Sequence, residues 1–340
     1  MDSSPSVGIV SAGVYLPKAR ITAAEISRLS GIPEDVIVNK MGIRCKPVPG
    51  QADHTNAMAL WASQDAFVQT SIQPDELDLI LCTTEEWKEY PLWTAGIKLA
   101  YDLGAKHAWA IDVQMRCATT MATLKLAKAM MVSDPDINTV LIAGGYRNGD
   151  FIDYTNPRSR FAFGLSAGAS ALLLQKNFPR NCLLESSVMV DGSFSLDVII
   201  PAGGTIEPIT AEAIVRRRNK IDVPDPEGMK ERLDRISMQN FLAVIDQALA
   251  KSGLSRSDIG YLNILHMKPS AHQFVLRELG LREDQSFYLG EYGHIGQHDQ
   301  ALSIKKGLET GRLRDGMVMV MVAAGIGYAW SASVVKWGPN

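Results

Sequence analysis

Several features that mark specialised proteins are scarce or missing in this chain. Its four cysteines are widely spaced and form no C-x-x-C pair, which argues against a zinc site and a disulfide framework. The longest apolar run, Met317 to Ile326, has about half the length of a membrane span. A net charge of −3 gives no sign of nucleic-acid binding. The N-terminus has no basic segment followed by an apolar core, so no secretory signal is indicated. We therefore expect a cytoplasmic protein with no metal, no membrane contact and no nucleic-acid partner.

The chain does contain an internal duplication, which appears when the sequence is compared with itself at an offset of roughly 180 residues. Each copy has an amphipathic helix, a polar turn and an apolar strand, followed later by another apolar strand. The matching segments are 56–66 with 238–248, 77–84 with 259–266, and 140–145 with 320–325. Alternating helices and apolar strands predict mainly parallel or mixed sheets covered by helices. We therefore expect an α/β chain of two pseudo-symmetric halves, 1–175 and 176–340, with a polar insert near 205–230.

Cys117 stands between an apolar run, 108–116, that predicts a buried strand and a segment with helical spacing, 118–130. Unpaired N–H groups and the helix dipole at the first turn of a helix favour the thiolate, which is the nucleophilic form of cysteine. A free cysteine that only fills space in the core is the alternative. On position alone, that alternative is the better interpretation.

Three more reactive side chains fall at equivalent positions of the two halves. His266 ends a strand of the second half, and Glu85 follows the matching strand of the first. His294 precedes a helix that matches the helix after Cys117. Sheets of this kind bind ligands outside the carboxyl ends of their strands. A cysteine with two histidines there indicates nucleophilic catalysis, because a thiolate needs partners that donate or accept protons.

Short motifs along nearly the whole chain share their order and spacing with one family. They are Tyr15-Leu-Pro17, Met41-Gly-Ile-Arg44, Cys117 itself, Gly164-Leu-Ser-Ala-Gly-Ala-Ser170, His266, Gly293-His294 and Ala324-Gly-Ile-Gly-Tyr-Ala-Trp-Ser-Ala332. In this order they resemble the "YLP" turn, "TGIR", the nucleophile, "GDGAGA", the histidine of "HQAN", "GN" and "GGGFTWGSA" of the thiolase superfamily of condensing enzymes. The branch of β-ketoacyl-ACP synthase III and HMG-CoA synthase is the most similar. This resemblance implies a thiolase-like duplicated, five-layered αβαβα fold.

The resemblance also implies a reaction. An acyl group from coenzyme A or an acyl carrier protein would move onto Cys117, and a second thioester would attack it as a carbanion, in a Claisen condensation. His266 and His294 would donate hydrogen bonds to the enolate oxygen. The backbone of Cys117 and of the turn Gly325 to Gly327 would form the oxyanion hole for the acyl oxygen. The implied substrates are acyl-CoA or acyl carrier protein thioesters, with no bound cofactor, and the implied assembly is a homodimer.

Two departures from synthase III leave the chemistry open. His294 replaces the asparagine of that family and could act as a donor or as a base. Glu85 falls where HMG-CoA synthase has its catalytic glutamate. An HMG-CoA synthase-like condensation of acetyl-CoA with a β-ketoacyl thioester, with Glu85 as acid/base, is therefore an alternative. A solvated charged loop around Glu85 fits the sequence equally well.

Two further functions fit the sequence less well. A degradative thiolase would need a second cysteine near the C-terminal end, but no cysteine follows Cys182. A non-catalytic acyl-binding or scaffold subunit would need neither the cysteine nor the two histidines.

Basic residues supply candidate contacts to the phosphates of coenzyme A or to an acidic carrier protein. Arg44 keeps the arginine of the family's "GIR", and Arg216, Arg217, Arg218 and Lys220 form a cluster in the insert. A solvated basic helix face explains the cluster equally well.

Two polar residues, His298 and Asp299, follow His294 closely in the sequence. They either tune that histidine or stabilise the loop and cap the following helix, and the sequence favours the second interpretation.

Overall fold

The computed structural model describes residues 5–339, and the first half of the described chain builds one part of a nine-stranded sheet. β4 pairs in parallel with β5 and β6, whereas β7 is antiparallel to both β6 and β1, so this part is a mixed sheet. The strands are β1 (Val7–Tyr15), β4 (Leu79–Cys82), β5 (Trp109–Asp112), β6 (Thr139–Tyr146) and β7 (Gly168–Lys176). The main helices are α3 (Thr55–Phe67), α4 (Ala95–Leu103) and α5 (Thr119–Ser133).

Among residues 5–339, the second half repeats this order without a strand that matches β5, and it builds the other part of the sheet. β9 and β10 are parallel, and β11 is antiparallel to β10 and to β8. The strands are β8 (Arg180–Val190), β9 (Ile259–Ile264), β10 (Val318–Gly325) and β11 (Ala329–Pro339). The helices that match the first half are α7 (Pro226–Lys251), α8 (Pro269–Glu278) and α9 (Asp299–Glu309).

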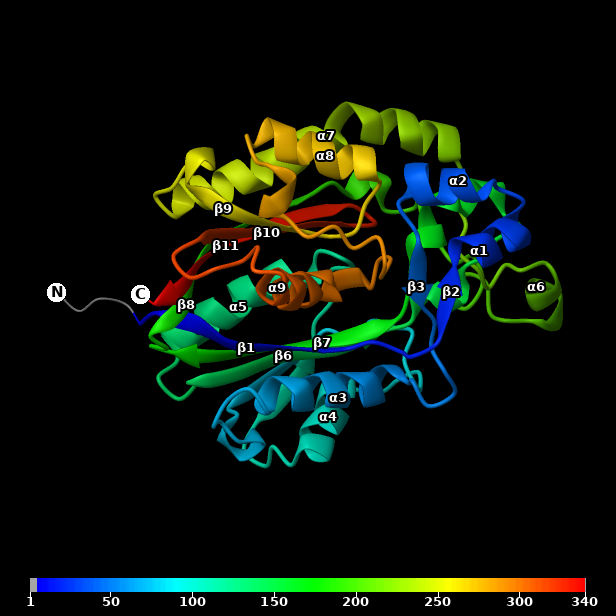
Figure 1. Ribbon diagram of the computed structural model, residues 1–340. Helices are drawn as coiled ribbons and strands as arrows, with labels where there is room; N and C mark the ends of the chain where they lie inside the picture. Colours follow the sequence, from blue (N-terminus) through cyan, green and yellow to red (C-terminus); the bar gives the residue numbers. More distant parts are fainter. Residues whose placement is uncertain (1–4, 340) are drawn as a thin grey trace.

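The two parts of the sheet lie as separate layers. Their strands follow the order β5-β4-β6-β7-β1-β8-β11-β10-β9, and β1 and β8 are joined through the single pair of Gly8 and Cys182. Figure 1 shows α5 and α9 between the layers, α3 and α4 below, and α7 and α8 above. The expected αβαβα layering and the thiolase-like fold class are therefore confirmed. The carboxyl ends of β6 and β10 reach the same side of the central helices, where the reactive residues lie.

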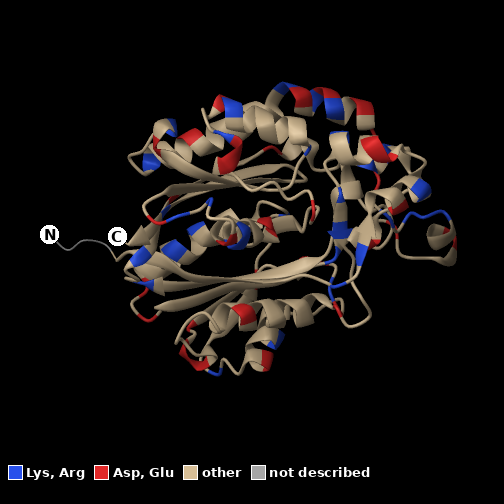
Figure 2. Cartoon of the chain, in the orientation of Figure 1, with Lys and Arg blue, Asp and Glu red and all other residues tan. Residues whose placement is uncertain are grey.

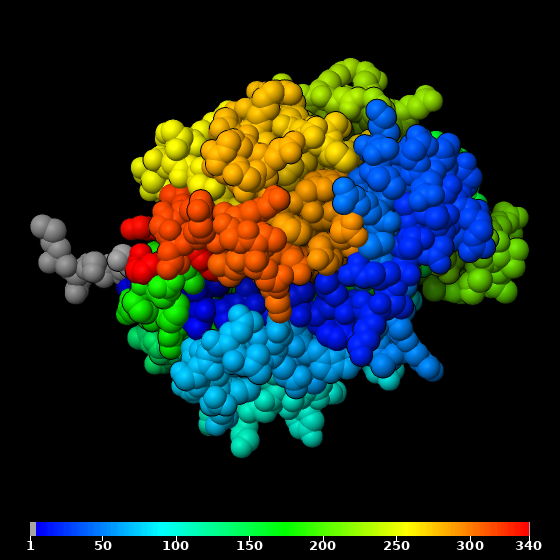
Figure 3. Space-filling model, in the orientation of Figure 1, coloured from blue at the N-terminus to red at the C-terminus, as the bar shows by residue number. Residues whose placement is uncertain are grey.

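Two excursions leave this repeated frame. The first, between β1 and α3, contains β2 (Arg20–Thr22), α1 (Ala23–Ser30), α2 (Glu34–Val36), the π-helix η1 (Ile37–Met41) and β3 (Cys45–Pro47). The second, between β8 and α7, contains α6 (Ala211–Val215). Figure 3 shows the blue N-terminal excursion against orange residues of the second half, and Arg44 N–H donates to Gly290 O at 2.9 Å there. The short helices elsewhere are η2 (Pro74–Glu76), η3 (Asn148–Phe151), η4 (Pro157–Gly164), η5 (Gly192–Phe194), η6 (Arg256–Asp258), η7 (Glu283–Gln285) and η8 (Gly296–His298).

Two glycines allow α3 to lie directly on the first part of the sheet. A Cβ on Gly13 of β1 would come within 2.0 Å of Ala62 O, and a Cβ on Gly145 of β6 would come within 2.0 Å of Thr55 O. Any side chain at either position would push the helix away from the strands. The end of β6, which borders the site described below, is therefore fixed by backbone contact with α3.

One local expectation was wrong, and one expected helix is confirmed but begins earlier than expected. The run 108–116 predicted a buried strand, but β5 is an edge strand in which Trp109 is 47% and Ile111 is 38% exposed. Apolar residues alone do not tell a covered strand from an edge strand. The helix predicted over 238–248 begins at Pro226, where Asp225 caps it by accepting from Gly228 N–H. Its first half carries charged side chains of both signs (Figure 2), so it has no continuous apolar stripe for the sequence to reveal.

Candidate active site

Cys117 lies in the turn between β5 and α5, two residues before the helix begins, and its side chain is buried. The residue before it, Arg116, has a φ of 52°, in the left-handed region that residues with a Cβ rarely adopt. Thr119 holds this turn, because its hydroxyl accepts from Met115 N–H at 2.7 Å and donates to Arg116 O at 2.5 Å. The tight turn presents the thiol to residues from the second half of the chain.

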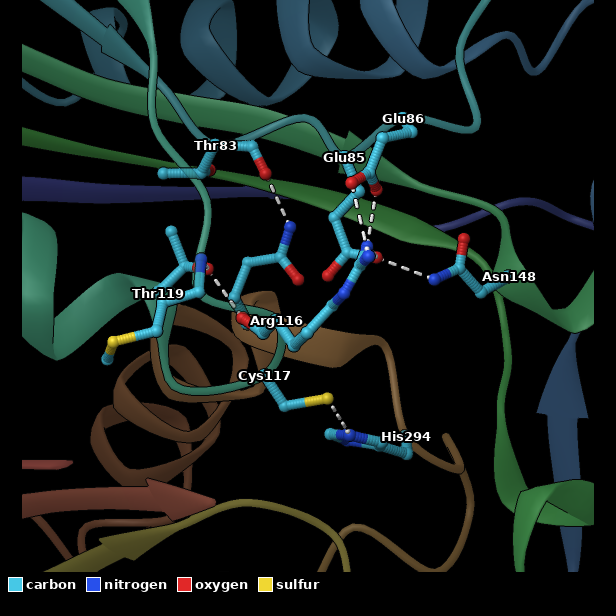
Figure 4. Close-up of polar contacts among 10 residues, drawn as sticks. Thr83, Glu85, Glu86, Arg116, Cys117, Thr119, Asn148 and His294 are labelled. Atoms are coloured by element: carbon cyan, nitrogen blue, oxygen red, sulfur yellow. Dashed lines mark hydrogen bonds and ion pairs between the residues drawn. The ribbon is translucent and has the colours of Figure 1, made fainter. Parts of the chain in front are cut away.

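His294 is the direct partner of that thiol. Its Nε2 lies 3.0 Å from Cys117 Sγ, and its Nδ1 lies 2.6 Å from Asp299 Oδ2 (Figure 4 shows the contact with Cys117). Burial by itself lowers the pKa of His294, but the charges of Asp299 and Cys117 outweigh it and raise that pKa well above the ordinary value. The imidazole is therefore stabilised in its protonated form, beside the sulfur of Cys117.

Asp299 organises the loop on which His294 lies. It is fully buried, and besides the imidazole its carboxylate accepts from His266 N–H at 2.7 Å and from Ile295 N–H at 2.9 Å. The sequence favoured a helix cap at this position, but the carboxylate turns back onto the loop before α9 instead. We call Cys117, His294 and Asp299 the triad. The short separation of His294 and Asp299 was visible in the sequence, but the direction of the carboxylate was not.

His266 reaches the same pocket but points elsewhere. Its Nε2 lies 3.0 Å from the carbonyl oxygen of Gly42, and burial lowers its pKa, which favours the neutral ring. A carbonyl can only accept, so the proton of the neutral ring lies on Nε2 and is donated to Gly42. The expected donation from His266 to an enolate oxygen stays a prediction, because in this arrangement its N–H already has a partner.

Glu85 faces the interior of the protein. It is 3% exposed, and its Oε2 accepts from Asn148 Nδ2 at 2.7 Å and from Arg116 at 3.4 Å (Figure 4). Its other oxygen, Oε1, is buried without a partner among residues 5–339. Burial raises the pKa of this carboxyl, against the opposing effects of Arg116 and Asn148. The solvated-loop interpretation is therefore wrong for Glu85, although the next residue, Glu86, does lie at the surface, where it pairs with Arg116.

Tyr146 is a site residue that the sequence did not single out. It ends β6 and is buried, and its ring centroid lies 6.4 Å from that of His294. Its pKa is raised first by burial and then by the charges of Cys117, Glu85 and Asp299, so its hydroxyl lies among these groups. The signal was available: Tyr146 ends a strand, as His266 and Glu85 border strand ends.

At the predicted oxyanion hole, the backbone of β10 at Gly325 lies close to the turn that carries Cys117. A Cβ on Gly325 would lie 2.7 Å from Met115 O and 3.1 Å from Cys117 N, so only glycine lets β10 approach the nucleophile turn this closely. Gly327 lies in the turn between β10 and β11 with a φ of 113°. The role of these backbone groups in holding an acyl oxygen stays a prediction.

A pocket of about 500 Å³ leads to the site, and both His266 and His294 line it. Three exposed cations also line it: Lys40 from η1, Arg160 from η4, and Lys268 from the start of α8. Within residues 5–339, none of the three forms an ion pair. Sequence reasoning missed them because they come from three distant segments and form no run.

The basic residues that the sequence did propose lie elsewhere. Arg44 lines a second pocket and pairs with Glu291 at 3.4 Å. Each of the four basic residues in the insert has a partner. Arg216 pairs with Glu212 and Arg217 pairs with Asp153, both at 2.7 Å. Arg218 pairs with Glu207, and Lys220 donates to Asp150 O. None of the five lines the pocket that leads to His294. Their role in binding a carrier therefore has no support from their position.

Two other features are absent from the described residues. Between residues 5 and 339, no cluster of three or more His, Cys, Asp and Glu side chains is placed to hold a metal ion. Over the same residues, no helix is both long enough and apolar enough to cross a membrane.

Comparison with known proteins points to one family. The family model described as 3-oxoacyl-[acyl-carrier-protein] synthase III matches residues 111–192, and the model of its C-terminal part matches residues 249–337. The chain is 24% identical over 332 residues to a β-ketoacyl-[acyl-carrier-protein] synthase III of Sulfurovum sp., with 96% of this chain and 94% of that protein covered. It is 25% identical over 333 residues to one of Desulfitobacterium hafniense, with 98% of each covered.

Among solved structures, the 3-oxoacyl-[acyl-carrier-protein] synthase III of Aquifex aeolicus superposes with a TM-score of 0.83 at 17% identity. The superposition covers 97% of this chain and all of that chain, which shows the shared fold. The nucleophile turn and the loop of His294 both lie within the segments that the family models match. The chain therefore belongs to the 3-oxoacyl-[acyl-carrier-protein] synthase III family, the acyltransferases of the thiolase fold that carry out condensations.

Proposed function

We propose that this protein carries an acyl group as a thioester on Cys117 and then transfers it to a second substrate. The hydrogen-bonded line from Cys117 Sγ through His294 to Asp299 carries this proposal. A protonated imidazole beside the sulfur favours the thiolate, and a thiolate is the form that attacks a thioester. A binding or scaffold subunit would have no use for a buried carboxylate that orients this histidine.

In the first step, the thiolate of Cys117 attacks the carbonyl carbon of the acyl thioester. A bond forms between that carbon and Sγ, the bond to the carrier sulfur breaks, and the leaving thiolate takes the proton from His294 Nε2. We assign the oxyanion hole to the backbone of Cys117 and of the turn from Gly325 to Gly327. A single hydrogen-bond donor in such a hole lowers the activation free energy by about 3 kcal/mol.

Family membership favours condensation as the second step. A malonyl thioester would lose CO2, its carbanion would attack the carbonyl carbon of acyl-Cys117, and the Cys117 thiolate would leave as a β-ketoacyl thioester forms. Once its Nε2 has taken up a proton again, His294 can donate it in a hydrogen bond to the developing enolate oxygen of the second thioester. His266 can assist only after its ring has turned away from Gly42.

A second candidate is transfer of the acyl group to a hydroxyl or an amine. Two observations favour it: Asp299 holds His294 in the orientation of a general base, and the N–H of His266 is donated to Gly42. In that reaction His294 Nε2 would take the proton of the acceptor while the acceptor oxygen or nitrogen attacks acyl-Cys117. This step needs one base and no second donor for an enolate.

A third possibility is the HMG-CoA synthase-like condensation, in which Glu85 removes a proton from an acetyl thioester. The buried position and raised pKa of Glu85 support it, because a catalytic carboxyl works best with a pKa near neutrality. The ion pair with Arg116 opposes it, because this pair stabilises the carboxylate and weakens the base.

The donor that we propose is a coenzyme A or acyl carrier protein thioester. Lys40, Arg160 and Lys268 line the pocket, and their unpaired charges suit the phosphate groups that either carrier brings. We therefore propose that the carrier binds at the mouth of the His294 pocket, rather than at the insert cluster suggested by the sequence. A free catalytic thiol works in a reducing compartment, so we also propose the cytoplasm as the location.

We propose a homodimer that forms along β5. Among the strands of residues 5–339, β4 is the single neighbour of β5, and Trp109 and Ile111 are exposed on β5. Two more large apolar side chains, Ile97 and Tyr101, are exposed on α4, which packs against β5. An exposed edge strand with apolar side chains invites pairing with another strand. A second copy of β5 would complete the edge and cover these residues.

Intact-protein mass spectrometry after mixing with acetyl-CoA, longer acyl-CoAs or acyl carrier protein thioesters tests the proposed function. Wild type is expected to gain the mass of one acyl group, Cys117→Ala is expected to gain none, and Cys182→Ala is the control that should behave like wild type. The acyl-enzyme is then offered a malonyl thioester, an acetyl thioester, or alcohols and amines, and the acceptor that discharges it identifies the second step. Absence of an adduct from every donor would contradict the proposal.

A further inference from the structure

Lys46 is a buried cation that the proposed mechanism does not use. Its side chain, on β3, is 1% exposed, and its Nζ donates to Phe163 O at 2.7 Å and to Leu165 O. Among residues 5–339 it forms no ion pair, and its Nζ lies 5.5 Å from the centroid of the Tyr154 ring. A buried ammonium without a carboxylate is costly to the fold, and burial lowers the pKa of Lys46 to about 7. An apolar side chain of the same length would avoid that cost.

Lys46 donates to the carbonyl oxygens of Phe163 and Leu165, and the residue between these two binds the backbone of His294. Gly164 O, between them, accepts from His294 N–H at 2.8 Å, and Ser166 N–H donates to His294 O at 2.9 Å. Both backbone polar groups of the histidine are therefore bound to the segment 163–166. Lys46 binds the same segment through the carbonyls that His294 leaves free.

The contact between these parts is close. Gly293, which precedes the histidine, has a φ of 62°, and a Cβ there would lie 2.6 Å from Gly164 O and 3.0 Å from Lys46 Cβ. The other end of the segment is also held, because Ser166 Oγ donates to Pro47 O at 2.7 Å, next to Lys46 in β3. A displacement of the segment 163–166 would therefore move the backbone of His294, and with it the distance between Nε2 and Cys117 Sγ.

We propose that Lys46 is a positioning residue for the chemistry of Cys117: it fixes the segment 163–166, and that segment fixes the ring of His294 against the thiol. The proposal rests on the proposed function, because it assumes that His294 activates Cys117. Lys46 does not touch the reacting atoms. Its effect passes through backbone hydrogen bonds, so it should depend on the N–H donors of the side chain more than on its bulk.

The test compares variants that remove or keep those donors. Lys46→Met keeps the length and removes every donor, Lys46→Gln keeps two donors on a shorter neutral side chain, and Lys46→Arg keeps donors and charge. Lys176→Met is the matched control, because Lys176 also donates to two backbone carbonyls, those of Asp134 and Pro135, at the end of β7. Thermal unfolding of each variant reports stability separately from reactivity.

The measurement is the rate at which iodoacetamide alkylates Cys117 between pH 5 and 9, followed by mass spectrometry of the peptide that contains it. Asp299, Tyr146, Glu85 and His266 also shape this profile and are unchanged in every variant. Lys46 itself, whose pKa burial lowers to about 7, is removed from the profile in Lys46→Met and Lys46→Gln, whereas Lys46→Arg keeps a positive charge. In Lys46→Met we expect the rate at pH 7 to fall about tenfold and the midpoint to move up by about one pH unit, since a tenfold change in an equilibrium corresponds to one pKa unit. Lys46→Gln and Lys46→Arg should fall between this and wild type, and Lys176→Met should match wild type.

A wild-type profile in Lys46→Met would overturn the proposal. If that variant does not fold, Lys46→Leu decides, because it also removes every donor, and a wild-type profile there would overturn the proposal equally. Failure of the proposed function looks different: in the wild-type protein, Cys117 would then react no faster at pH 7 than the half-buried Cys182, and His294→Ala would leave its rate unchanged.

Discussion

The carboxylate of Asp299 lies 2.6 Å from His294 Nδ1, on the side of the ring opposite to Cys117, and is fully buried. A carboxylate in this position selects the tautomer and orientation of an imidazole and stabilises its protonated form. The same carboxylate also accepts from the backbone N–H of His266. It therefore connects the two histidine segments of the second half, and several expected outcomes depend on it.

Asp299→Asn keeps the shape of the side chain but removes its charge. We expect acyl transfer to fall by about 10²- to 10⁴-fold, because an amide can hold the wrong tautomer and cannot stabilise the imidazolium. Single-turnover formation of acyl-Cys117 is the measurement, with circular dichroism to show that the fold is intact. A decrease of less than about threefold would mean that Asp299 serves only the structure of the loop.

The raised pKa of His294 predicts that its ring stays protonated at neutral pH. A histidine NMR titration of the wild type should show one ring that titrates well above the ordinary value of 6.5, and Cys117→Ala should move this transition down. Because the folded-state pKa is the higher one, this group stabilises the fold fully below the unfolded value and loses its contribution as pH rises through the folded value. A transition of His294 near 6.5 in the wild type would refute the assignment.

Glu85→Gln separates the candidate second steps. Glutamine can keep the contact with Asn148 but cannot act as a base, so condensation with an acetyl thioester should fall about 10²-fold or more if Glu85 takes the proton. Formation of acyl-Cys117 should stay near the wild-type rate. Asn148→Ala is the companion variant, because it disturbs the same contact but keeps the carboxylate. An equal loss in both variants would assign Glu85 a packing role.

Lys40→Ala combined with Lys268→Ala tests the mouth of the pocket. We expect the KM for an acyl-CoA to rise about fivefold with kcat little changed, because exposed charge pairs are each worth about 0.2–1 kcal/mol. The rise should shrink at high salt. Arg216→Ala is the control from the insert cluster and should leave KM unchanged. If Arg216→Ala raised KM and the double variant at the pocket did not, the carrier would bind at the insert instead.

Trp109→Glu tests the dimer along β5. A charge on each copy of this edge strand should repel the other copy, so sedimentation should report a monomer for the variant and a dimer for wild type. Leu308→Glu is a suitable control, because Leu308 on α9 is 46% exposed, close to the exposure of Trp109. If Trp109→Glu remains a dimer, the interface lies elsewhere.

Beyond the five-layered order, which the family resemblance implied, the sequence alone determined an α/β chain of two similar halves and two positions of the triad. Both follow from local patterns: apolar periodicity marks each strand and helix, and the duplication places Cys117 before α5 as it places His294 before α9. Strand ends in this kind of sheet converge, so the meeting of the cysteine and the histidine could be expected. No contact between distant side chains had to be known.

Only the tertiary structure decided what these side chains and their neighbours bind. His266 turns to Gly42, 224 positions away in the chain, and the carboxylate of Asp299 bends back to His294 instead of capping its helix. Lys46 meets the backbone at Phe163 across 117 positions. Such pairs depend on which segments the packing of the layers brings into contact and on where each buried polar group finds its partner. Local periodicity carries no information about either, because it specifies the face of an element and not the atom that the face will meet.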